Sequence, residues 1–306
     1  MTLVSRARPT TPPPASPGPG ARRRLPAPLA LVRPGQWPKN LLVVPLPLLG
    51  ATAQWDTAVR VALATAAFVL ASSLVYIVND IADVERDRRH PVKRHRPLAS
   101  GRLRTRTALA LGALLAALLT WALIALGSAG SWPVLGYLAL NAAYSWRLKH
   151  LPLLDVFTVA GGFVLRLLGG YAATGRPVAG WLVLTVLTLC LLLILGKRRH
   201  ELGVSGTGHR PALAGYSAHF LDLVLVLCAA LTTVGYLLHL RLESGLTAVA
   251  APLTAPCALF ALFRYLQIVT VHSGGGDPVR TLLLDRVMAA AFALWAGLLT
   301  TAHLFL

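Results

Sequence analysis

The chain has 306 residues, of which 56% are hydrophobic and only 13% charged, against the roughly 25% charged residues of soluble domains. A water-soluble fold cannot bury this much apolar surface, so the lipid bilayer must be part of the solvent. The 29 Lys and Arg residues far outnumber the 11 Asp and Glu residues, for a formal net charge of +18. Beside long apolar runs, this excess points to membrane lipids and phosphorylated substrates as partners, and away from nucleic acid.

The first segment, residues 1–28, is rich in Pro and Arg and lacks the apolar core of a signal peptide. We expect a disordered, basic, Pro-rich cytoplasmic tail there. Residues 29–306 are expected to form a single transmembrane domain, with no soluble domain in any loop.

Apolar stretches follow one another along that domain, each near the roughly 20 residues that a membrane-spanning helix needs. The predicted spans are 38–54, 57–79, 106–127, 131–147, 152–174, 178–196, 216–241, 246–271 and 282–305. Pro38, Pro45 and Pro47 interrupt the first span, so eight spans are the alternative. The predicted fold class is an all-α, multi-pass integral membrane helical bundle with about nine transmembrane helices.

Basic residues gather on one side of these spans. If the N-terminus is inside, 24 of the 29 Lys and Arg residues fall in the tail or in cytoplasmic loops, which is a strong positive-inside pattern. We therefore predict a plasma-membrane protein with its N-terminus inside, its C-terminus outside and its active site on the cytoplasmic side. A homo-oligomer is compatible with the sequence, which does not determine the oligomeric state.

Four of the 11 acidic residues lie within eight positions: Asp80, Asp83, Glu85 and Asp87. On a helix that advances about 100° per residue, Asp80, Asp83 and Asp87 share one face, whereas Glu85 lies on the other side. Carboxylates this close together need a cation or full hydration, and their hard oxygens favour Mg²⁺ shared with substrate phosphates. We predict that these three aspartates are the catalytic metal ligands; the alternative is a solvated acidic helix end.

Two basic clusters are candidates for phosphate binding. Lys93, Arg94 and Arg96 follow the acids in a loop between two prolines, and their side chains suit phosphate oxygens. Lys93 and Arg94, nearer the acids, are the favoured pair. Lys197, Arg198 and Glu201 close the sixth span and would suit a phosphorylated sugar. The alternative for both clusters is an anchor on lipid headgroups.

Further polar residues lie at the ends of the spans or within them. Tyr144 and Lys149 end the fourth span, and Asp155 begins the fifth. Arg166 lies about 16 Å along the helix from Asp155, so these two residues cannot pair directly. An arginine inside the membrane is costly and usually faces a protein-lined cavity. Arg166 therefore either binds a lipid phosphate or satisfies helix carbonyls.

The string NDIADVERD (79–87) resembles the NDxxDxxxD signature of the UbiA superfamily of intramembrane prenyltransferases. The blocks that extend the resemblance to its decaprenyl-phosphate phosphoribosyltransferase branch are RPGQWPKN (33–40), YIVNDIADVERDRRHPVKRHRPLASG (76–101), AYSWRLKH (143–150), VLRLLGG (164–170), GKRRHEL (196–202) and LLDRVM (283–288). Aromatic prenyltransferases of the superfamily carry a second Asp-rich motif after the sixth helix, whereas this chain has GKRRHEL there.

The resemblance implies a UbiA-like bundle and Mg²⁺-dependent transfer of 5-phosphoribosyl from phosphoribosyl pyrophosphate to a decaprenyl-type polyprenyl phosphate, as in cell wall biosynthesis. Asp80, Asp83 and Asp87 would hold Mg²⁺ on the pyrophosphate, with Asn79 in support. The residues implied to bind phosphates are Arg33, Gln36, Lys39, Asn40, Lys93, Arg94, Lys197 and Arg198. The alternatives are a UbiA-type prenyltransferase that alkylates an aromatic or lipid acceptor, and a transporter or membrane scaffold.

Overall fold

The computed structural model describes residues 25–44, 55–205, 211–246, 249–277, 281 and 284–305, and within them every regular element is a helix. The long helices are α2 (Trp55–Ala82), α4 (Thr105–Trp146), α5 (Leu154–Thr174), α6 (Gly180–Ser205), α7 (Ala218–Leu242), α8 (Ala250–Thr270) and α10 (Arg286–Phe305). The short elements are α1 (Ala27–Leu31), η1 (Pro34–Val43), α3 (Val84–Arg89), η3 (Lys93–His95), η4 (Leu148–His150) and η6 (Pro211–Gly215). The predicted all-α class is confirmed.

Six of these helices, α2 and α4 to α8, are long and apolar enough to cross a membrane, and α10 contains a shorter apolar stretch. The first predicted span falls partly on η1, and its residues 45–54 lie outside the described residues. The count of nine spans therefore stays a prediction. Most of the predicted tail, residues 1–24, is likewise outside the described part, but Ala27 and Pro28 already belong to α1.

Helix α4 consists of two antiparallel arms that meet at Gly127. This residue has φ 71° and ψ 176°, a conformation that is essentially restricted to glycine. Both ends of α4 lie beside the same end of α2, because Gly112 packs on Ile77 and the Ser145 hydroxyl donates to Asn79 Oδ1 at 3.1 Å. The sequence predicts a loop from Gly127 to Ser131, but the structure turns within one residue, and helix resumes at once.

Two other helix ends differ from the sequence prediction. Helix α6 runs to Ser205, past the predicted end at residue 196. The prediction followed the loss of hydropathy, but Lys, Arg, Glu and Leu are good helix formers and continue the helix into polar surroundings. Helix α2 ends at Ala82, and the separate helix α3 begins at Val84.

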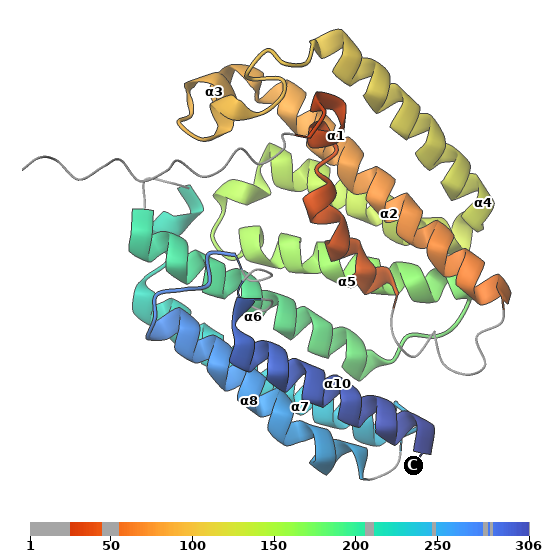
Figure 1. Ribbon diagram of the computed structural model, residues 1–306, viewed down its shortest axis with the longest axis vertical. Coiled ribbons are helices and arrows are strands. Elements are labelled where there is room, and N and C mark those ends of the chain that lie inside the picture. The colour runs from red at the N-terminus through yellow and green to blue at the C-terminus, as the bar shows by residue number, and fades with distance from the viewer. Residues whose placement is uncertain are drawn as a thin grey trace, which may run out of the picture.

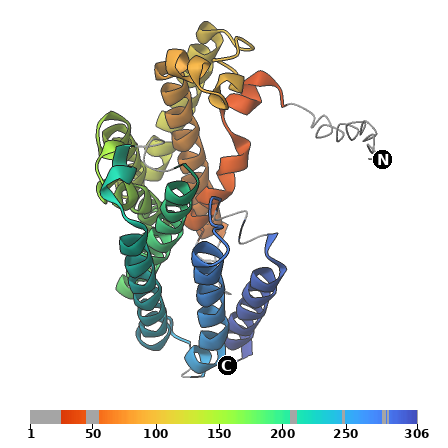
Figure 2. The same cartoon turned by 90° about the vertical axis from the view of Figure 1, so that its left-hand side faces the viewer.

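Each long helix packs mainly against its neighbours in the chain, as Figure 1 shows for α2, α4, α5 and α6, and η1 lies against α2 and α5. Large apolar side chains also face outward, among them Ile124 (76% exposed) and Phe263 (63%), as expected for surfaces that contact lipid. Figure 2 shows α1 and α3 at the same end of the molecule.

We expect Gly127→Ala to destabilise the protein, because a side chain in this backbone conformation costs on the order of 1–3 kcal/mol. The measurement is the melting temperature in detergent. Gly297→Ala is the matched control, since Gly297 is helical and an added methyl group there meets open space. Equal melting temperatures for the two variants would contradict the hairpin at Gly127.

Candidate active site

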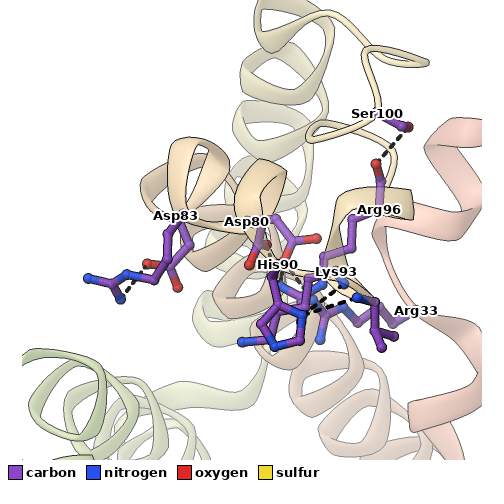
Figure 3. Close-up of polar contacts among 10 residues, drawn as sticks. Arg33, Asp80, Asp83, His90, Lys93, Arg96 and Ser100 are labelled. Atoms are coloured by element: carbon purple, nitrogen blue, oxygen red, sulfur yellow. Dashed lines mark hydrogen bonds and ion pairs between the residues drawn. The ribbon is translucent and has the colours of Figure 1, made fainter. Parts of the chain in front are cut away.

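Two buried carboxylates and two arginines meet at the end of α2 (Figure 3). Arg33 and Arg96 both donate to Asp80 Oδ1, at 2.5 and 3.1 Å, and Arg96 also donates to Asp87 Oδ2 at 2.6 Å. Asp80 and Asp87 are only 3% and 2% exposed. The arginines neutralise carboxylates that would otherwise be costly to bury, and they hold the two acids close together.

Asp83 lies apart from this group, as Figure 3 shows, and pairs instead with Arg86 at 3.3 Å. The sequence argument assumed one helix through Asp87, but the break between α2 and α3 falls at Asp83, which turns its side chain away. Within the described ranges, no three His, Cys, Asp or Glu side chains are grouped so as to hold a metal ion. The expected convergence of all three aspartates is therefore wrong for this arrangement, which brings Asp80 and Asp87 together.

Glu85 is separate from the buried acids, as its helical position predicts. Its side chain is 75% exposed and accepts from Arg88 at 2.5 Å.

The basic loop contributes Arg96 to the acids rather than Lys93 or Arg94. The backbone amide of Lys93 donates to His90 Nδ1, which turns the chain into η3, and Arg94 is exposed. Arg96 follows η3 in an extended conformation, with its side chain on Asp80 and Asp87. Sequence spacing does not show which basic residue of a short, proline-bounded loop turns back toward a helix.

A second buried cluster joins α5 to α6. Arg198 Nε donates to Asp155 Oδ2 and Arg198 Nη1 to Glu201 Oε2, both at 2.8 Å. The Tyr216 hydroxyl donates to Asp155 Oδ1 at 2.8 Å and accepts from the amide of Leu153 at 2.6 Å. Asp155 is fully buried and Arg198 is 3% exposed, so Arg198 serves an internal ion pair. Sequence reasoning missed Tyr216, which lies 61 positions from Asp155.

A cavity of about 140 Å³ lies between these clusters. Its lining residues are Lys39, Tyr76, Tyr137, Asn141, Tyr144, Thr158, Val159, Gly162, Phe163 and Arg166. Two cations, Lys39 of η1 and Arg166 of α5, are among these lining residues. The cavity therefore concentrates positive charge, which favours an anionic ligand.

Asn40, Asn79, Lys149 and Lys197 are also predicted site residues, and none of them lines this cavity. Asn40 is buried, and its side chain accepts from Arg166 and donates to Ser72. Asn79 binds the second arm of α4 through Ser145. Lys149 lies in η4, at the end of α4, and the Lys197 ammonium is 3.8 Å from Glu201.

A family model described as the UbiA prenyltransferase family matches residues 41–274. The chain belongs to the UbiA prenyltransferase family. The matched region contains Asp80, Asp87 and Arg96, the α5–α6 cluster and every cavity-lining residue except Lys39, while Arg33 lies before it. The family assignment and most of the site therefore concern the same part of the chain.

Curated relatives of this UbiA-family chain include proteins named decaprenyl-phosphate phosphoribosyltransferase. The one from Mycolicibacterium smegmatis is 34% identical, covering 90% of this chain and 91% of the relative. The one from Corynebacterium glutamicum is 33% identical, covering 86% and 82%. The nodulation protein NoeC of Azorhizobium caulinodans is 31% identical, covering 79% and 81%.

Solved structures of UbiA homologues share the fold. A homologue from Archaeoglobus fulgidus, bound to GPP and Mg²⁺, aligns with a TM-score of 0.66 at 18% identity, covering 90% of this chain and 99% of that one. A digeranylgeranylglyceryl phosphate synthase aligns with a TM-score of 0.63 at 16% identity, covering 90% and 98%. The UbiA-like bundle is thereby confirmed.

We expect Asp155→Ala to destabilise this UbiA-family protein by about 3–5 kcal/mol, because it leaves the buried Arg198 with one acidic partner fewer. Asp222→Ala is the control, since Asp222 pairs with Arg199 near the surface and such pairs contribute about 0–1 kcal/mol. Thermal unfolding in detergent measures both variants. Similar losses in the two would show that the buried cluster is not a principal support of α5 and α6.

Proposed function

We propose that the protein is a membrane transferase that moves 5-phosphoribosyl from phosphoribosyl pyrophosphate to a polyprenyl phosphate and releases pyrophosphate. The observation that carries this proposal is the full-length similarity to proteins named decaprenyl-phosphate phosphoribosyltransferase. The positive-inside pattern supports a cytoplasmic active site, where a water-soluble, phosphorylated donor is available.

The acid cluster is the proposed site for Mg²⁺ and the pyrophosphate. Mg²⁺ in proteins is usually bound by one or two carboxylates together with substrate phosphates and waters. Asp80 and Asp87 fit that role, because both are buried and both reach the same Nη1 atom of Arg96. Asp83, one turn from Asp80, would join them only with a change of rotamer or of the α2–α3 break. The metal would neutralise charge on the leaving pyrophosphate.

Arg33 and Arg96 are the proposed pyrophosphate ligands beside that metal. Both now donate to Asp80, and both are partly exposed, with 29% of each side chain accessible. Their donors can therefore shift from the carboxylates to phosphate oxygens when diphosphate and metal arrive together. Lys93 and Arg94 lie in the same loop and remain proposed as outer phosphate contacts.

The proposed chemistry is a substitution at C1 of the ribose. An oxygen of the lipid phosphate forms the new bond to C1, while the bond from C1 to the pyrophosphate oxygen breaks with its electron pair. The nucleophile is already an anion, so the site needs no general base. The protein side chains would position the two phosphates and stabilise the charge on the leaving group.

A prenyl diphosphate donor is the second candidate, since structural neighbours with the same fold include one bound to GPP and Mg²⁺. The end of α6 disfavours it for this chain. There Arg198 and Glu201 form an internal ion pair, and Lys197 adds positive charge. The polar lining of the cavity also differs from what a hydrocarbon chain requires.

The proposed function makes a direct prediction about the reaction. Purified full-length protein, given phosphoribosyl pyrophosphate, polyprenyl phosphate and Mg²⁺, should release pyrophosphate and form a phosphoribosylated lipid detectable by mass. EDTA should abolish both products. Transfer from a prenyl diphosphate to an added acceptor, with none from phosphoribosyl pyrophosphate, would replace this proposal with the second candidate.

Substitution of each acid tests which carboxylates bind the metal. Asp80→Asn and Asp87→Asn should each lower kcat by at least roughly 100-fold, in line with the loss of one key charge-stabilising group. Asp83→Asn should also abolish turnover if Asp83 is a metal ligand. Glu85→Gln, a change of the same kind within the same segment, should retain activity because Glu85 is exposed. Equal losses in all four variants would argue against a specific metal site.

A further inference from the structure

Arg166 is a buried cation whose hydrogen bonds go to uncharged groups. It is 6% exposed and donates to Asn40 Oδ1 and the Gly162 carbonyl at 2.8 Å, and to the Tyr137 hydroxyl at 3.1 Å. Across the described part of the chain, no carboxylate bonds to it, and Asp155, about 16 Å away along α5, is engaged by Arg198. A buried charge without a counterion is costly, so its retention favours an anionic ligand.

Aromatic rings hold the guanidinium in place. Its central carbon lies 4.4 Å from the ring centre of Tyr137, 5.2 Å from that of Phe163 and 6.0 Å from that of Phe68. Phe68 and Tyr137 in turn pack edge to face at 5.7 Å. With Asn40 bonded to Nε, these contacts fix Arg166 as a preformed wall of the cavity.

The cavity extends from Arg166 toward the acid cluster. Tyr76 lies one helical turn before Asp80 on α2 and lines the cavity, while its ring also stacks beneath Arg33 at 4.7 Å. A ligand with its diphosphate at Asp80 and Arg33 would therefore place its next atoms beside Tyr76. Tyr76 thus lies at the end of the cavity nearer the acid cluster, and Arg166 lies at the other end.

The walls between the two ends suit a sugar and not a hydrocarbon. Hydroxyl and amide groups come from Tyr76, Tyr137, Asn141, Tyr144 and Thr158. These groups can bond to the hydroxyls of a pentose. A prenyl chain in the same space would cover two cations, Lys39 and Arg166, without offering them any partner.

We propose that Arg166, positioned by Asn40 and Tyr137, sets the donor specificity by binding the terminal monophosphate of a phosphorylated sugar and by excluding a prenyl chain. This inference rests on the proposed function and assigns one subsite within it. The acid cluster takes the diphosphate end of the donor, and Arg166 takes the monophosphate end, with Lys39 beside it.

Two inhibitors probe the two ends separately in the wild-type transfer assay. Ribose 5-phosphate offers the monophosphate end, and inorganic pyrophosphate with Mg²⁺ offers the other. In Arg166→Met, the inhibition constant of ribose 5-phosphate and the KM for phosphoribosyl pyrophosphate should each rise by roughly 10- to 100-fold. This is the usual loss for hydrogen bonds to a charged group. Pyrophosphate inhibition should stay within about twofold, and geranyl diphosphate should inhibit more strongly than it inhibits wild type.

The matched control is Arg264→Met, which removes an arginine of α8 that pairs with Asp285 and does not line this cavity. It should leave both inhibition constants unchanged. Arg166→Lys, which keeps the charge, should restore part of the ribose 5-phosphate affinity. Unchanged ribose 5-phosphate inhibition in Arg166→Met, or an equal loss for pyrophosphate, would overturn the assignment.

Tyr137→Phe gives an independent test if Arg166→Met fails to fold. It keeps the ring beside Arg166 and removes only the hydroxyl, so ribose 5-phosphate should bind about 2- to 10-fold less tightly. An unchanged value would again overturn the inference. A wild-type protein that shows no turnover of phosphoribosyl pyrophosphate would contradict the proposed function itself, a result separate from any effect of these variants.

Discussion

The pairing of buried acids with arginines from distant segments is the constraint on which the rest of the site depends. In a low-dielectric interior an isolated carboxylate is very costly, and this chain has only 11 acidic residues. Asp80 is held by Arg33, ahead of η1, and by Arg96, after η3, which also holds Asp87. Asp155 is held by Arg198 on α6. These ion pairs hold the segment before η1, the basic loop that contains η3 and the junction of α5 and α6 around one cavity.

The same pairing decides which cations remain to bind a ligand. Arg198 donates to Asp155 and Glu201, so two carboxylates already balance its charge at the end of α6. Lys39 and Arg166 line the cavity. The cavity thus contains two cations, Lys39 and Arg166, and lies near Asp80 and Asp87, the carboxylates proposed to bind the metal. This is the arrangement that a ligand with phosphates at both ends requires.

Hydropathy was sufficient to predict the fold class, because in a bilayer the backbone must satisfy its own hydrogen bonds and apolar helices are the solution. The family motif also placed the acid cluster correctly at the end of α2. Local rules failed where one residue decides the backbone, as at Gly127 and at the break beside Asp83. They also could not pair Asn40 with Arg166, 126 positions apart, or choose Arg96 over its basic neighbours. Such contacts depend on how helices meet in space, and spacing along one helix carries no information about that.

The fold alone does not choose the donor. Homologues that align over most of this chain at 16–18% identity include one bound to GPP and Mg²⁺, so the fold by itself is compatible with more than one kind of ligand. In this chain, the space beyond the acids has a largely polar lining. Tyr and Thr hydroxyls, the Asn141 amide and Arg166 line it, and a hydrocarbon would offer none of them a hydrogen bond. Donor specificity in such a bundle can therefore change without altering the metal site, through the few side chains that line the cavity.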